Sequence, residues 1–94
     1  MTVAEILSKA GESESEALRE HAIFLCMSKI SRYEAESEQF QNKYGESFES
    51  FRKQVRRGNK KEDFIKEDDF LDWEYANTAL SYWRDCLEEL RGAG

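Results

Sequence analysis

Two stripes of mostly apolar residues, each repeating at alternating intervals of three and four, constrain the fold of this chain more than any other feature. On an α-helix this spacing places every member of a stripe on one narrow face. The stripes are Ile23, Cys26, Ile30, Tyr33, Ser37, Phe40 and Tyr44, then Trp73, Ala76, Leu80, Trp83, Leu87 and Leu90. A connector that reverses the chain would bring the two faces together. We therefore predict an all-α fold, an antiparallel helical hairpin of two long helices with a short connecting helix.

The composition predicts one helical domain with a thin core. The 94 residues suffice for a single domain, 1–94, but only 39% are hydrophobic and 36% are charged, so a monomer would bury little apolar surface. Aromatic residues, 13% of the chain, partly compensate because each ring can bury a large area. The absence of proline suits long helices. A thin core beside an aromatic stripe favours a homo-oligomer, and we expect a dimeric helical bundle.

Capping residues and glycines set the expected helix boundaries. Thr2 and Ser13 each precede a glutamate by three residues, a capping-box pattern that starts a helix. Gly45 is a candidate terminator because glycine readily adopts the left-handed conformation that ends many helices. These signals predict helices over 3–9, 14–43, 48–56 and 70–90, with a loop over 58–69. Near the start of the helix over 14–43, Leu18, Ala22 and Leu25 lie slightly out of phase with the first stripe. They widen its apolar face, as a bundle helix with more than one neighbour needs.

The predicted loop is polar except for one apolar pair. We expect that pair, Phe64 and Ile65, to pack under a helix end. Asp68 or Asp69 would then cap the final helix, because a carboxylate there suits the positive end of the helix dipole.

The tryptophans of the second stripe allow two interpretations. Trp73 and Trp83 can both be buried in the core of the hairpin or of a dimer, or part of the stripe can bind a partner, since such rings often anchor interfaces. Tyr75, Ala79 and Tyr82 fall beside the stripe, and an exposed aromatic flank would indicate association. The candidate helix–helix or oligomer interface comprises Ile23, Ile30, Tyr33, Phe40, Tyr44, Trp73, Ala76, Leu80, Trp83, Leu87 and Leu90.

A basic cluster follows the first stripe. It contains Arg52, Lys53, Arg56, Arg57, Lys60 and Lys61. The cluster is either a solvated face balanced by the acidic residues that follow it, or a contact for an acidic protein surface or RNA. No aromatic residue is interleaved for base stacking, and the net charge of −6 opposes binding to phosphate backbones. Nucleic acid is therefore the weaker form of the functional interpretation.

No group of residues indicates catalysis, a metal or a cofactor. His21 is the only histidine and has no ligand partner at a characteristic spacing. Cys26 and Cys86 lie on or beside the stripes and are expected to pack as small apolar groups, although the hairpin could bring them face to face. The sequence has no signal-peptide pattern and no apolar run long enough to span a membrane. We predict a cytoplasmic, non-enzymatic protein with reduced thiols and no membrane contact.

The segment Gln39-Phe40-Gln41-Asn42-Lys43-Tyr44-Gly45-Glu46-Ser47-Phe48-Glu49-Ser50-Phe51 resembles a known pattern. It is similar to the F-x-x-K-Y-G-x-S-F-x-x-F segment of small helical antitoxins of type II toxin–antitoxin systems, the TumA-like and related uncharacterised coiled-coil antitoxins. Those proteins continue into a helix with W-x-x-A-x-x-x-L-x-x-L, which the second stripe resembles from Trp73 onward. The resemblance implies a cytoplasmic, dimeric protein that sequesters a toxin, a small ribonuclease, by wrapping it with helices.

These observations together favour a binding protein over an enzyme. We expect a non-enzymatic protein–protein interaction module, and an antitoxin that sequesters a small toxin is its sharpest form. The alternative is a small RNA- or DNA-binding regulator that uses the basic helix over 52–61.

Overall fold

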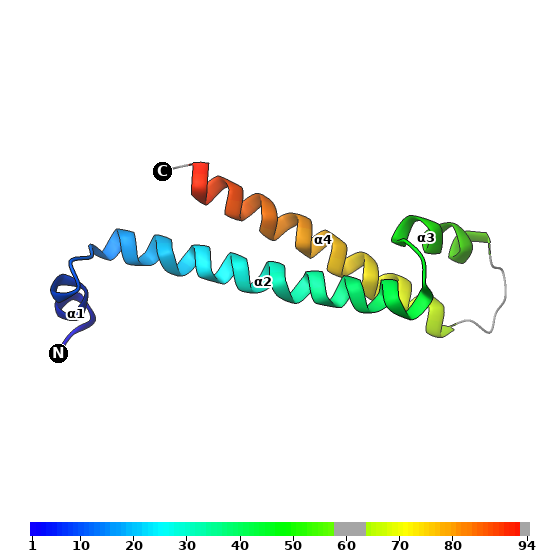
Figure 1. Ribbon diagram of the computed structural model, residues 1–94, viewed down its shortest axis with the longest axis horizontal. Helices are drawn as coiled ribbons and strands as arrows, with labels where there is room; N and C mark the ends of the chain where they lie inside the picture. The colour runs from blue at the N-terminus through cyan, green and yellow to red at the C-terminus, as the bar shows by residue number, and fades with distance from the viewer. Residues whose placement is uncertain (58–63, 93–94) are drawn as a thin grey trace.

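The computed structural model describes residues 1–57 and 64–92, and all regular structure within them is α-helical. Its elements are α1 (Val3–Lys9), α2 (Glu14–Tyr44), α3 (Phe48–Arg57) and α4 (Phe64–Gly92). Helices α2 and α4 run antiparallel and pack together, α3 lies at the turn between them, and α1 lies at the start of α2 (Figure 1). The structure confirms the predicted all-α hairpin. None of the described helices is both long and apolar enough to cross a membrane.

The predicted caps fix the ends of the first two helices. The side-chain oxygens of Thr2 and Ser13 accept hydrogen bonds of 3.1 Å from the backbone N–H groups of Glu5 and Glu16. Gly45 ends α2 with φ at +65°, in the left-handed region. This conformation disfavours residues that carry a Cβ, which explains why glycine stands there.

The predicted start of the last helix is wrong, because α4 begins at Phe64 rather than at residue 70. The part of the predicted loop over 58–63 lies outside the described residues. No glycine or proline interrupts the sequence from Phe64 until Gly92, so the helix continues through the polar stretch. Phe64 and Ile65 are exposed rather than packed under a helix end.

Asp69 does not cap the helix, because its carboxylate is used across the hairpin. Lys43 donates a hydrogen bond to Asp69 Oδ2 at 2.6 Å, and the Tyr44 hydroxyl donates another to the same oxygen. These hydrogen bonds, with that from Lys43 the stronger cause, hold the pKa of Asp69 below its usual range. Asp69 therefore ties the start of α4 to the end of α2.

A cluster of aromatic rings closes the turn end of the hairpin around Trp73. The Trp73 side chain is 1% exposed. Its ring centroid lies 5.9 Å from that of Phe40, 5.3 Å from Phe48 and 5.4 Å from Phe51, and Tyr44 stacks at 6.4 Å. Residues from α2, α3 and α4 thus share one core, and α3 is held against α4 by it.

The molecule is long and thin. It measures 62 × 28 × 19 Å with a radius of gyration of 19.6 Å, against about 12 Å for a compact chain of this length. The buried hydrophobic residues of the described chain are Cys26, Tyr33, Phe51, Trp73 and Ala76. The single chain therefore leaves much of its helical surface without a protein neighbour.

Candidate interaction surface

The predicted interface residues form the seam between α2 and α4 within one chain. Tyr33, Trp73 and Ala76 are buried. The remaining members are partly buried, and they are Ile23, Ile30, Phe40, Tyr44, Leu80, Trp83, Leu87 and Leu90. The stripes thus form the contact between α2 and α4 within the chain, and a contact with another molecule must use the sides of this seam.

One side of the seam is closed by polar pairs, and we call it the polar flank. The Arg84 guanidinium lies 2.8 Å from Glu34. The Ser37 hydroxyl donates to Asn77 Oδ1 at 2.7 Å and accepts a hydrogen bond of 3.0 Å from Trp73 Nε1. These contacts join the two helices directly, so the polar groups that make them already have partners within the hairpin.

Helix α3 lies on the same side of α4 as the polar flank. The ring of Phe48 in α3 stacks on Phe70 at 5.6 Å, and Phe70 precedes Asn77 by two helical turns. The opposite side of the hairpin is therefore not covered by α3.

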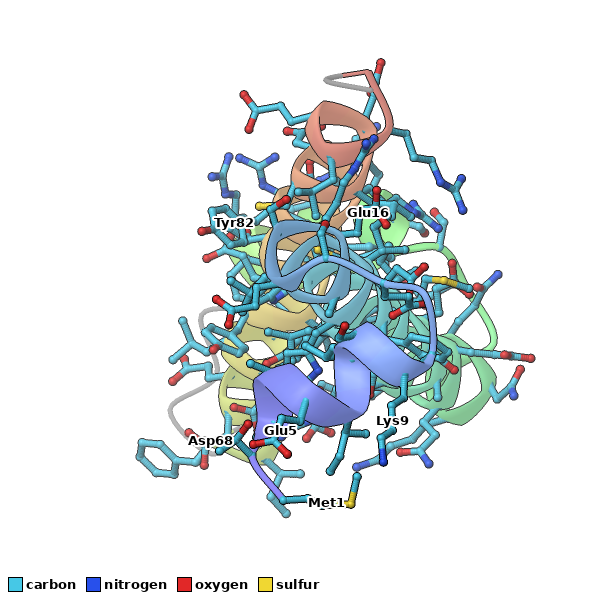
Figure 2. All side chains as sticks on the ribbon, turned by 90° about the vertical axis from the view of Figure 1, so that its left-hand side faces the viewer. Met1, Glu5, Lys9, Glu16, Asp68 and Tyr82 are labelled. Atoms are coloured by element: carbon cyan, nitrogen blue, oxygen red, sulfur yellow. The ribbon has the colours of Figure 1, made fainter. Side chains whose placement is uncertain are left out.

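That opposite side is apolar, and we call it the open flank. It comprises Leu18, Ala22 and Leu25 of α2 with Tyr75, Ala79, Tyr82 and Cys86 of α4. Leu18 is 70% exposed and Leu25 43%, while Tyr75 and Tyr82 are 63% and 60% exposed. In the view along the hairpin, Tyr82 lies on the opposite side of the molecule from Glu16 (Figure 2). Large apolar side chains from both long helices therefore lie on one uncovered side.

The tyrosines of the open flank are anchored on the seam and uncharged at neutral pH. The Tyr75 ring meets Tyr33 edge-on at 6.0 Å, and a hydrogen bond with Tyr33 raises the pKa of Tyr75. A hydrogen bond with the Cys86 thiol raises the pKa of Tyr82, whose ring packs edge-on against Trp83 at 5.1 Å. Both rings thus present neutral, amphipathic surfaces of the kind that anchors interfaces.

The open flank is bounded by charge at its turn end. There Arg32 forms an ion pair with Glu36 at 3.3 Å. Glu36 also lines a shallow depression with Asp72 and Tyr75. The apolar part of the flank therefore ends about where the acidic pair Glu36 and Asp72 begins.

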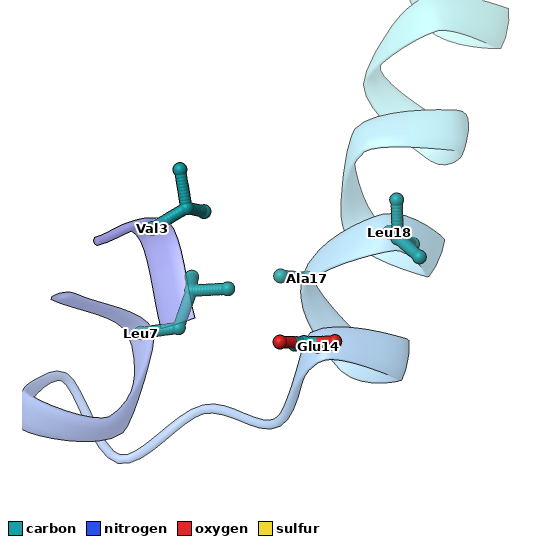
Figure 3. A pocket seen from close by; sticks show the side chains of 5 residues that line it. All are labelled: Val3, Leu7, Glu14, Ala17 and Leu18. Atoms are coloured by element: carbon teal, nitrogen blue, oxygen red, sulfur yellow. The ribbon is translucent and has the colours of Figure 1, made fainter. Parts of the chain in front are cut away.

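At the other end of the hairpin, the apolar surface continues onto α1. Val3 and Leu7 of α1 line a pocket of about 340 Å³ together with Glu14, Ala17 and Leu18 of α2, and Leu7 points toward Ala17 across it (Figure 3). Leu18 belongs both to this pocket and to the open flank. The apolar surface is thus contributed by α1, α2 and α4.

The predicted basic face lies on α3, away from the open flank. Lys53, Arg56 and Arg57 are exposed, whereas Arg52 is partly buried and lies 3.6 Å from Glu49. The remaining predicted members, Lys60 and Lys61, lie outside the described residues. The exposed members on α3 are accessible to solvent.

The chemistry of the described residues is limited. Over residues 1–57 and 64–92 no group of three or more His, Cys, Asp or Glu residues could hold a metal ion. Cys26 is buried and Cys86 partly buried, and both are free thiols. His21 is exposed on α2.

The sequence pattern identified residues on both halves of the open flank, but not which side of the seam stays uncovered. Tyr75, Ala79 and Tyr82 were expected beside the stripe. Leu18, Ala22 and Leu25 were expected to widen the apolar face near the start of α2.

Comparisons of the chain with protein-family models, with curated proteins and with solved structures find no match.

Proposed function

We propose that this chain is a non-enzymatic protein–protein interaction module whose contact surface is the open flank. The observation that carries the proposal is the exposure of Leu18, Leu25, Tyr75 and Tyr82 on one side of the hairpin, while the other side is closed by polar pairs. Contiguous apolar surface of this kind marks interaction sites in soluble proteins. Its tyrosines and leucines supply the large, neutral side chains that interface centres use.

The total exposed surface supports the same proposal. The chain exposes 7350 Å², whereas the scaling of surface with mass gives about 5,600 Å² for a compact monomer of 11.0 kDa. A hairpin of two helices cannot bury both sides of its seam. Covering one side with another protein would remove much of this excess.

The sharper form of the proposal is a cytoplasmic antitoxin that sequesters a small toxin. Its support is the antitoxin-like segment from Phe40 to Phe51. In the structure, Phe40, Tyr44, Phe48 and Phe51 surround Trp73, and Gly45 ends α2. The shared pattern therefore consists of residues that build the turn of the hairpin, and the antitoxin role rests on this likeness and on the apolar flank together.

The test is co-expression with the product of the adjacent gene. We expect that product to arrest growth when expressed alone and to be harmless, and co-purified, when this chain is present. Leu25→Glu and Tyr82→Glu place a charge on the open flank and should abolish both effects. Phe24→Glu is the matched control, because Phe24 is 73% exposed and neighbours Leu25 but lies off the open flank.

Two results would contradict the proposal. A neighbouring product that is neither toxic nor bound would remove the antitoxin form. An unchanged interaction in Leu25→Glu and Tyr82→Glu, with helicity intact by circular dichroism, would remove the open flank as the contact surface.

A further inference from the structure

The open flank is suited to meet a copy of itself. Building on the proposed function, we infer that the occupant of this surface is a second copy of the chain, so that two hairpins form an antiparallel four-helix bundle. Leu25 and Ala22 of α2 in one copy pack against Tyr82 and Cys86 of α4 in the other.

The available area matches what a dimer needs. A specific interface of standard size buries about 800 Å² on each partner. The chain exposes about 1,700 Å² more than the scaling for a compact monomer gives, so one such interface fits within the excess. The apolar residues of the flank run from Leu18 to Leu25 on α2 and from Tyr75 to Cys86 on α4, about 11 Å and 17 Å of helix.

The height of each residue, meaning its position along the long axis of the hairpin, decides which residues of the two copies can meet. The contact of Tyr33 with Tyr75 fixes which residues of α2 and α4 lie side by side. Leu25 lies eight residues before Tyr33 and Tyr82 seven residues after Tyr75, so Leu25 and Tyr82 are at nearly the same height. By the same count, Leu18 lies near the height of Glu89 and Leu90, and Ala22 lies at the height of Cys86.

A two-fold axis parallel to the helices relates the two copies and leaves the position of each residue along the helix direction unchanged. It places α2 of one copy over α4 of the other, so Leu25 meets Tyr82. All neighbouring helices then run antiparallel, as in up-and-down four-helix bundles. Arg32 comes to lie near the height of Tyr75, where a cation can contact an aromatic ring, and Lys29 near the height of Ala79.

The other two-fold axis, perpendicular to the helices, fits the side chains less well. It would place α2 of one copy over α2 of the other, running in the opposite direction. With the axis at Leu25, Leu18 of one copy would lie over Arg32 of the other. That arrangement would bury a charged guanidinium against leucine, which costs free energy. The chemistry of the flank therefore favours the parallel axis.

Sedimentation of the purified chain tests the occupant. We expect twice the monomer mass of 11.0 kDa for the wild type and for Phe24→Glu, and monomer mass for Leu25→Glu and Tyr82→Glu. All three side chains are exposed in the single chain, so helicity by circular dichroism should stay unchanged. A wild type that remains monomeric at every concentration would overturn the inference, as would dissociation of Phe24→Glu to the same extent as Leu25→Glu.

Cross-linking tests the arrangement. In a background of Cys26→Ala and Cys86→Ala, chains with Leu25→Cys are mixed with chains carrying Tyr82→Cys and treated with a short thiol cross-linker. The parallel axis predicts a cross-linked dimer in the mixture and little in either preparation alone. Efficient linking of the Leu25→Cys chain to itself would instead support the perpendicular axis and overturn the arrangement inferred.

The outcomes separate this inference from the proposed function. If the wild type is monomeric but Leu25→Glu still abolishes protection in co-expression, the second copy is excluded and the open flank remains the contact surface for the neighbouring product. If the wild type is dimeric and co-expression shows neither toxicity nor binding, the antitoxin form fails and the inference stands.

Discussion

Replacing Trp73 with alanine removes the side chain around which α2, α3 and α4 meet. The ring is 1% exposed, and its Nε1 donates a 3.0 Å hydrogen bond to Ser37. A buried Trp→Ala change costs about 3–5 kcal/mol, and the lost hydrogen bond adds about 1 kcal/mol. The expected loss of about 4–6 kcal/mol equals most of the stability of a small domain, which lies near the low end of about 5–15 kcal/mol.

The assay is urea unfolding followed by far-ultraviolet circular dichroism, with all variants at one protein concentration because association would stabilise the folded state. Trp83→Ala is the matched control, since Trp83 is only partly buried and should cost less than half as much. Trp73→Phe keeps a ring but loses the hydrogen bond to Ser37, and we expect an intermediate loss.

Equal losses for Trp73→Ala and Trp83→Ala would refute the reasoning. So would a loss below about 2 kcal/mol for Trp73→Ala, which is less than burial alone assigns to the side chain. Either result would mean that the aromatic cluster does not hold the turn end of the hairpin together.

Three further predictions concern Asp69, Gly45 and the thiols, and a fourth concerns α3. Because the pKa of Asp69 is lowered on folding, its contribution to the stability of the fold is present above the unfolded pKa of about 4 and is lost as pH falls through the folded pKa. The difference in melting temperature between wild type and Asp69→Asn should therefore shrink below about pH 4. Gly45→Ala should cost about 1–2 kcal/mol in urea unfolding through backbone strain alone, since nothing lies within 4 Å of the added Cβ; an unchanged midpoint would contradict the left-handed cap. Cys86 should react with a thiol reagent before the more buried Cys26, and equal rates without denaturant would be inconsistent with the structure. Single-stranded RNA should show no salt-dependent mobility shift, whereas a shift abolished by Arg57→Glu would favour the nucleic-acid alternative.

The hairpin could be predicted because its signals are local and periodic. The stripes of α2 and α4, the caps Thr2 and Ser13, and the glycine that ends α2 each follow from helix geometry. The start of α4 could not be predicted in this way. Asp69 has the side chain of a helix cap, but its hydrogen bonds with Lys43 and Tyr44 depend on a helix distant in sequence.

The open flank was predictable only in part. Tyr75 and Tyr82 lie beside the second stripe, so their position followed from the repeat. Which side of the seam stays uncovered depends on the docking of α3, and that is set by Phe48 against Phe70. The repeat carries no information on this choice, because a side chain facing α3 and one facing another molecule have the same spacing.

Hydroxyl-radical footprinting of the assembled protein measures whether the open flank is covered. Tyr75 and Tyr82 are 63% and 60% exposed in the single chain, and Phe24 is 73% exposed. We predict that labelling of both tyrosines falls as the protein assembles, with its own copy or with a bound partner, while labelling of Phe24 stays constant. Tyrosines that remain as reactive as Phe24 in the assembled state would show that the open flank is not the contact surface.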